Sequence, residues 1–141
     1  MIRQTRASRP APLLALALSL PAAALAQDLP LPRGFYIDAA VACAEASNAT
    51  LSLLHKTGLN SARSDCSFTA MTTEGNGIFA YRETCTTIPD GDSYEGEGRI
   101  EVLGPERFRL FGDDWERAFR HCPQAALPEP WRDNDISDLL D

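Results

Sequence analysis

Five acidic side chains crowd one short stretch of the 141-residue chain. They are Asp90, Asp92, Glu95, Glu97 and Glu101. Carboxylate oxygens are the ligands that Ca²⁺ prefers, but the EF-hand spacing is not met, because Tyr94 stands where a third ligand is needed. We therefore interpret the group as a solvent-facing acidic surface that binds a basic partner, and not as a metal site.

The same carboxylates do not predict an enzyme. Two carboxylates on one face can act as acid and base on a glycosidic bond, but that chemistry needs a cleft that raises one pKa, and a single exposed strand offers none. The two histidines, His55 and His121, have no third residue that would complete a catalytic metal site. No nucleophile-elbow motif is present either. We expect no catalytic residue, no metal and no cofactor.

Four cysteines predict two disulfide bonds. Cys43, Cys66, Cys85 and Cys122 are an even number in a short chain, and no two are spaced as in a C-x-x-C motif. Of the three possible connectivities we prefer sequential pairing, Cys43 with Cys66 and Cys85 with Cys122. Each bridge stabilises the folded protein by roughly 3–4 kcal/mol, because it closes a loop in the unfolded chain. This free energy is similar for sequential and nested pairing, so the alternatives stay open.

The first 26 residues indicate an oxidising destination for these cysteines. Three arginines precede an apolar stretch from Ala11 to Ala26, which ends in the small-x-small pattern Ala24-Leu25-Ala26. This pattern is typical of a cleaved secretory signal peptide and predicts a periplasmic or secreted protein with no membrane insertion after cleavage. Without residues 1–26 the chain keeps 10 basic and 20 acidic residues. Such an acidic balance makes nucleic acid a poor partner.

Period-two alternation predicts a mainly β domain over residues 34–122. Between Ser93 and Leu103, apolar residues and glycines alternate with polar and charged ones. Further strands are predicted over 34–37, 50–55, 66–73, 78–88, 107–110 and 115–122. We expect an antiparallel meander of six or seven strands that forms a half-barrel or small sandwich, braced by two disulfides. Residues 39–47 could hold a helical turn, and a helix over 39–56 competes with the strand at 50–55.

Two details of the alternation concern the interior. Gly96 and Gly98 fall on the predicted inward face, which indicates a bend or the close packing of another group. In the strand at 78–88, one register turns Glu83 inward and the other turns Arg82 inward. A buried charge needs a partner, so we hypothesise an ion pair with a neighbouring strand; the alternative is a sheet-edge position from which the side chain reaches solvent.

The β domain is flanked by two segments with other compositions. Residues 27–33 contain prolines and predict an extended lead-in. Residues 123–141 form an acidic, proline-rich tail, which we place outside the domain. Trp131, Ile136, Leu139 and Leu140 could instead dock this tail back onto the domain.

The order of the cysteines carries a family resemblance. Gly34-Phe35-Tyr36 opens the domain, the first cysteine leads to Ser47–Thr50, the second begins a predicted strand, the third ends one and the fourth closes the domain. In this the chain resembles the small exported four-cysteine β-domain proteins of bacteria that carry no assigned activity, and more loosely the periplasmic lysozyme inhibitors. The resemblance implies a periplasmic β domain without catalytic residues.

These features predict a monomeric, non-enzymatic binding or envelope-accessory domain. Its acidic surface would attract a basic protein, and inhibition of a lysozyme-type enzyme is the concrete form of this hypothesis. The alternative is a binder of a small apolar ligand, held on the concave face of the sheet near Gly96 and Gly98, in a cavity lined by Tyr94, Ile100 and Phe108. A hydrolase is the third class that we retain.

Overall fold

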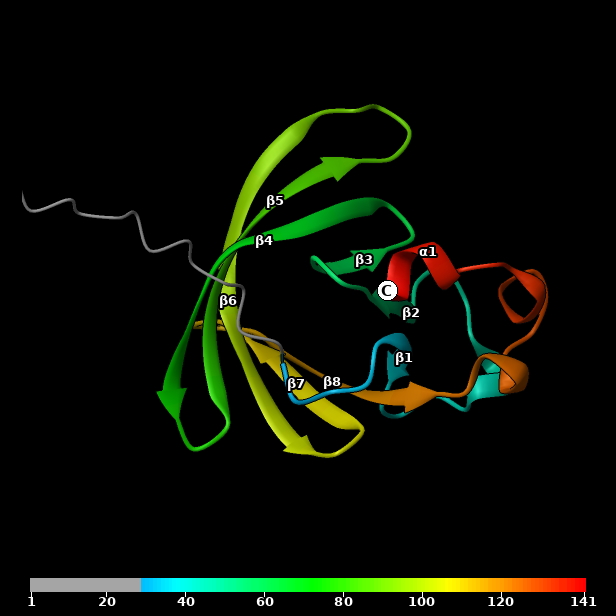
Figure 1. Cartoon of the computed structure of the whole chain (residues 1–141), viewed down its shortest axis with the longest axis horizontal. Coiled ribbons are helices and arrows are strands. Elements are labelled where there is room, and N and C mark those ends of the chain that lie inside the picture. The colour runs from blue at the N-terminus through cyan, green and yellow to red at the C-terminus, as the bar shows by residue number, and fades with distance from the viewer. Residues whose placement is uncertain (1–28) are drawn as a thin grey trace, which may run out of the picture.

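Eight antiparallel strands form a closed barrel in the computed structural model, which describes residues 29–141 (Figure 1). The strands are β1 (Gly34–Asp38), β2 (Leu51–Leu54), β3 (Leu59–Ser61), β4 (Ser64–Gly75), β5 (Ile78–Thr87), β6 (Ser93–Gly104), β7 (Arg107–Phe111) and β8 (Glu116–Cys122). The predicted antiparallel meander is confirmed. The predicted signal peptide, residues 1–26, lies outside the described residues. Within residues 29–141 no helix has the length and apolar character needed to cross a membrane.

The barrel differs from the predicted half-barrel of six or seven strands in one added strand and in its closure. The added strand is β3, whose three residues follow Gly58 and are too few to show an alternation. Closure comes from the pairing of β1 with β8, in which Tyr36 stands opposite His121. Pairing between the first and last strands depends on sheet curvature, which the alternation of side chains does not encode. The helix considered for residues 39–56 is limited to one 3-10 turn, η1 (Cys43–Glu45).

Apolar side chains fill the inside of the barrel. The buried members of this interior cluster are Leu31, Tyr36, Leu54, Tyr81, Ile100, Phe108 and Phe119. The ring of Phe108 lies 4.9 Å from that of Phe119 and 4.9 Å from that of Tyr36, measured between centroids. The Tyr36 hydroxyl donates a hydrogen bond of 2.8 Å to the Pro32 carbonyl. Because Leu31 belongs to this cluster, the lead-in segment contributes to the core.

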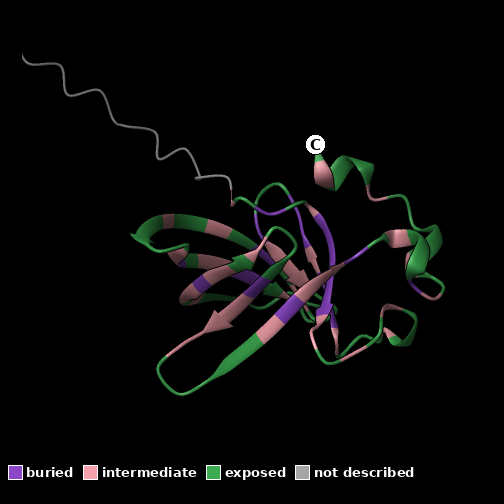
Figure 2. Ribbon diagram, turned by 90° about the horizontal axis from the view of Figure 1, so that it is seen from below, coloured by how far each residue is buried: buried purple, intermediate pink, exposed green. Residues whose placement is uncertain are grey.

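A second apolar cluster lies on the outside of the barrel, where the C-terminal tail covers β1 and β2. The tail holds η2 (Gln124–Ala126), η3 (Trp131–Asp133) and the short helix α1 (Ser137–Leu140). Phe35 and Ile37 pack there with Leu127, which is 2% exposed, and Trp131 adds to the cluster. Figure 2 shows buried residues along the strands that face the tail. The tail therefore docks on the domain instead of lying outside it, because β1 carries apolar side chains on both faces.

The disulfides join Cys43 to Cys122 and Cys66 to Cys85. The preferred sequential pairing was wrong, and the nested alternative is correct. Cys66 and Cys85 stand directly opposite each other on β4 and β5, whereas Cys122 ends β8, which is separated from β5 by β6 and β7. Strand register decides this pairing, and loop lengths carry no information about register. Two disulfides fit an oxidising compartment.

The inward faces of β5 and β6 fit closely against each other. Tyr81 and Glu83 stand opposite Gly98 and Gly96. A Cβ added at Gly98 would lie 2.8 Å from the Tyr81 hydroxyl, and one at Gly96 would lie 3.0 Å from Glu83 Oε1. Close packing by two cross-strand side chains thus explains both glycines.

The register of β5 turns Glu83 inward and Arg82 outward. Arg82 pairs on the surface with the exposed Glu97, at 3.8 Å between Nε and Oε2. Within residues 29–141 no ion pair joins Glu83 to a cation, so the hypothesised inward ion pair is absent from the part of the chain that the structure describes.

We expect Leu127→Ala to lower the free energy of unfolding by about 2–4 kcal/mol, because it opens a cavity in the buried cluster between the tail and β1. Urea denaturation followed by circular dichroism measures this loss. Leu103→Ala is the matched control, since Leu103 is 47% exposed. A Leu127 variant as stable as the Leu103 variant would contradict the docked tail.

Candidate functional site

A cavity of about 330 Å³ opens at the end of the barrel where the β3–β4, β5–β6 and β7–β8 turns lie. Its walls come from β2 to β8 and from the β7–β8 turn. The lining residues are Ser52, Leu59, Asn60, Ser61, Ser64, Cys66, Phe68, Tyr81, Glu83, Tyr94, Leu110, Trp115, Arg117 and Phe119. Barrels of eight strands have room inside for one small ligand, and this volume is at the lower end for ligand sites.

Aromatic side chains line the solvent-exposed part of this mouth cavity. Tyr94 is 45% exposed and Trp115 is 46% exposed, although both are large apolar side chains. Deeper in the cavity, the Phe68 ring meets the Tyr81 ring edge-on at 5.3 Å between centroids. Exposed aromatic side chains around a hollow are typical of binding sites.

Glu83 supplies a carboxylate to the wall of the mouth cavity. Its carboxylate lies within 4.8 Å of the Cys66 and Cys85 sulfur atoms and covers Gly96. Desolvation by burial raises the pKa of Glu83 above its ordinary value of 4.5. Within residues 29–141, no hydrogen bond or ion pair is formed by this carboxylate with another side chain. A ligand in the cavity therefore meets a carboxyl group whose charge, when it is ionised, no cation within residues 29–141 compensates.

Arg117 stands at the rim of the mouth cavity, with its positive charge already compensated. Its Nε lies 3.4 Å from Asp38 Oδ2, and its Nη2 donates a hydrogen bond of 2.7 Å to the Ala49 carbonyl. The guanidinium also lies over the Phe119 ring, 5.1 Å from the centroid. These contacts hold the side chain as part of the wall.

The structure places the five predicted acidic residues on the outside of the barrel, and it does not gather them into one unpaired surface. Asp90 and Asp92 lie exposed in the β5–β6 turn. Glu95 accepts a hydrogen bond of 2.8 Å from Thr84, and Glu97 pairs with Arg82. Glu101 forms an ion pair with Arg109. Arginines on neighbouring strands thus neutralise part of the predicted acidic surface.

The cavity also differs from the one predicted on the concave face. Tyr94 lines it as predicted, but Ile100 and Phe108 do not, because each is only 1% exposed and packs in the closed interior cluster. Sequence reasoning missed Trp115 and Arg117 as lining residues. Their signal was parity: if Phe119 faces inward, then Arg117 and Trp115 fall on the same side of β8 and of the turn before it.

The histidines form no joint metal site in the described part of the chain. His55 Nε2 lies 2.8 Å from Asn60 Oδ1, whereas the His121 ring packs edge-on against Tyr36 at 5.3 Å. Within residues 29–141 one group of potential metal ligands is close enough together, namely Cys66, Glu83 and Cys85. Its two sulfurs form a disulfide, so they are not available as thiolate ligands.

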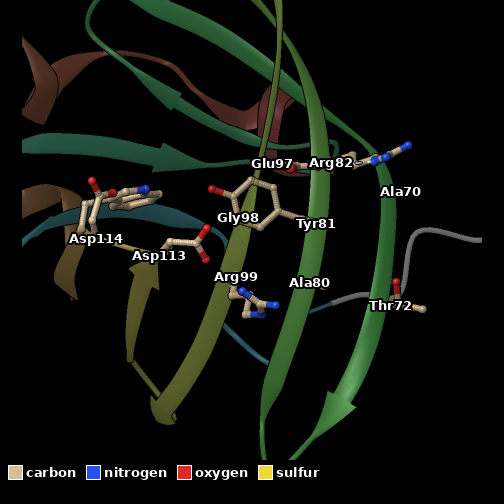
Figure 3. A pocket seen from close by; sticks show the side chains of 12 residues that line it. Ala70, Thr72, Ala80, Tyr81, Arg82, Glu97, Gly98, Arg99, Asp113 and Asp114 are labelled. Carbon is tan, nitrogen blue, oxygen red and sulfur yellow. Dashed lines mark ion pairs between the residues drawn. The ribbon is translucent and has the colours of Figure 1, made fainter.

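A second hollow, of about 590 Å³, lies beside the first half of β6. Residues 93–98 of β6 pair with β5, but the ladder to β7 begins only at Arg99, opposite Phe111. The edge of the sheet is therefore open over these six residues. Asp113 and Asp114, in the β7–β8 turn, lie across this opening from Gly98 (Figure 3).

Comparison with known proteins gave no match to a family model, to a curated protein or to a solved structure. The family resemblance drawn from the cysteine order thus stays a prediction.

We expect Glu83→Gln to stabilise the fold at neutral pH by on the order of 1 kcal/mol, because the amide removes the cost of burying an unpaired charge. The folded-state pKa of Glu83 is raised, so the wild type loses stability relative to the variant as pH rises from 4.5 through that raised pKa. Well below pH 4.5 the Glu83 carboxyl is protonated in the folded and in the unfolded protein, so the difference in stability between the wild type and the variant vanishes. Urea melts at several pH values test this, and an equal gap at all pH values would contradict it.

Proposed function

We propose that the protein is an exported, non-enzymatic binding protein that holds a small ligand in the mouth of its barrel. The observation that carries this proposal is the mouth cavity, with two aromatic side chains, Tyr94 and Trp115, half-exposed at its entrance. In a soluble protein, exposed aromatic surface around a concave site is stabilised by binding an apolar group.

Binding is a better account of this cavity than catalysis. General acid–base chemistry needs two ionisable groups that converge on the reacting atoms. In the described part of the cavity wall, Glu83 is uncommitted, but Arg117 is held by Asp38 and by the Ala49 carbonyl. One free carboxylate among aromatic rings can orient a ligand, whereas a hydrolase would need a second group.

Export is part of the proposal. The amino-acid pattern of residues 1–26 is that of a secretory signal peptide. The two disulfides of the barrel are consistent with delivery to the periplasm or outside the cell, where such bonds persist.

A second candidate function is supported by the open edge of β6. An extended peptide can add to such an edge as a further strand, with its backbone bonded to the sheet. Arg82 and Arg99 also line this hollow, but they are paired with Glu97 and Glu74. Asp113 and Asp114 lie across the edge without an ion pair among the described residues, so they would favour a basic segment. A basic segment at this edge is the form in which we retain the predicted basic protein partner, and it replaces binding to a continuous acidic face.

We expect the neutral apolar probe N-phenyl-1-naphthylamine to bind in the mouth cavity with one saturable site and increased fluorescence. Tyr94→Ala combined with Trp115→Ala should weaken its binding about tenfold or more, because two aromatic contacts are lost. Leu103→Ala removes a comparably exposed apolar side chain from elsewhere and should leave binding unchanged. Unsaturable binding, or equal affinity in all variants, would show that the cavity is not the site.

We expect a 12-residue peptide of alternating lysine and threonine to bind the β6 edge, and its affinity to fall as salt is raised. Asp113→Asn with Asp114→Asn should weaken this binding several-fold, by removing two charges beside the edge. Glu45→Gln with Glu106→Gln changes the net charge equally at exposed positions and serves as the control. Isothermal titration calorimetry measures the three affinities. Equal weakening in both double variants would mean that net charge, and no defined edge, attracts the peptide.

A further inference from the structure

The chemistry of the mouth cavity specifies one class of ligand, provided that the proposed function of the cavity is correct. The charges on its wall are those of Glu83 and Arg117. Arg117 is neutralised by Asp38 at 3.4 Å, so the wall carries the remaining negative charge of Glu83. A half-buried carboxylate is costly unless a cation pairs with it, and within residues 29–141 no cation does.

The rings around Glu83 favour the same sign of charge. Phe68 stands opposite Glu83 on β4, Tyr81 lies two residues away on β5, and Tyr94 lies two residues before Gly96 on β6. Trp115 completes the entrance from the β7–β8 turn. Aromatic faces attract organic cations through their quadrupole, and a cage of several rings is the usual site for a quaternary ammonium group. An anionic ligand would be repelled by both the rings and the carboxylate.

From these contacts we infer that the cavity binds a small organic cation, with its ammonium group beside the Glu83 carboxylate and its apolar body between Tyr94 and Trp115. The cavity volume of about 330 Å³ is enough for one small organic molecule of this kind. The Cys66–Cys85 disulfide and Gly96 form the wall behind the carboxylate.

The titration of Glu83 gives this site a pH dependence with a definite sign. The carboxylate must be ionised to attract the cation, so affinity falls as pH falls through the pKa of Glu83, which burial places above its ordinary value. The ionisable side chains that share the cavity with it are Tyr81 on β5, Tyr94 on β6 and Arg117 on β8, and on β4 it faces Phe68 and the bridged Cys66. Burial, with a contribution from Glu83, raises the pKa of Tyr81 to about 12, so Tyr81 stays neutral in the range where Glu83 titrates.

The test compares benzyltrimethylammonium with neopentylbenzene, which has the same shape but no charge. Trp131→Phe leaves Trp115 as the one tryptophan, whose fluorescence reports binding in the cavity. We expect the cation to bind at least about tenfold more tightly than the neutral analogue. Glu83→Gln should abolish this preference. Glu116→Gln, at an exposed position at the start of β8, should retain it. In the protein with Glu83, the preference should also disappear at acidic pH.

The outcomes separate the ligand class from the proposed function. Equal affinity for the two probes, or a preference for the cation that survives in Glu83→Gln, overturns the inference but leaves the small-ligand site intact. Failure of both probes while N-phenyl-1-naphthylamine still binds also overturns it. If none of the three probes binds, the proposed function itself fails.

Discussion

The pairing of β1 with β8 is the contact on which the barrel depends. β1 has five residues, and it forms ladders with β2 on one side and β8 on the other. Tyr36 enters the interior cluster, while Phe35 and Ile37 face outward beneath the tail, so both faces of this strand are buried. Without this seam the sheet would remain open, Phe119 on β8 would not meet the interior, and β5 and β6 would face solvent instead of a cavity. Closure therefore produces the candidate site as well as the core.

The alternation of apolar and polar residues predicted the individual strands well, because each of the long strands has one face toward solvent and one toward the barrel interior. The strand predicted for 93–103 is β6, and that for 78–88 is β5, with small differences at the ends. What depends on register or curvature was not accessible in this way. The three residues of β3, the partner of Cys122 and the closure by β1 all follow from which strands meet, and one strand's pattern carries no information on its distant neighbours.

The candidate site shows the same division between local pattern and register. The carboxylates of β6 were visible in the sequence, but their partners were not, since Arg82 meets Glu97 and Arg109 meets Glu101 only through the pairing of separate strands. Glu83 was recognised as a charge that one register would turn inward, and the two glycines as marks of close packing; the structure joins these observations, because Glu83 covers Gly96. Residues that share a cavity but come from seven different strands have no common signature in the chain.

The seam between β1 and β8 joins the two ends of the domain, and the tail that covers it comes last in the chain. During synthesis β1 emerges early, yet Arg120 and His121 on β8, and then Leu127, become available only when almost the whole polypeptide has been made. Until then Phe35 and Ile37 lack their contacts with Leu127, and Cys43 has no native partner. A product truncated near residue 120 would thus expose apolar side chains of β1 and an unpaired Cys43 thiol together, and exposed apolar surface makes incomplete chains prone to aggregate.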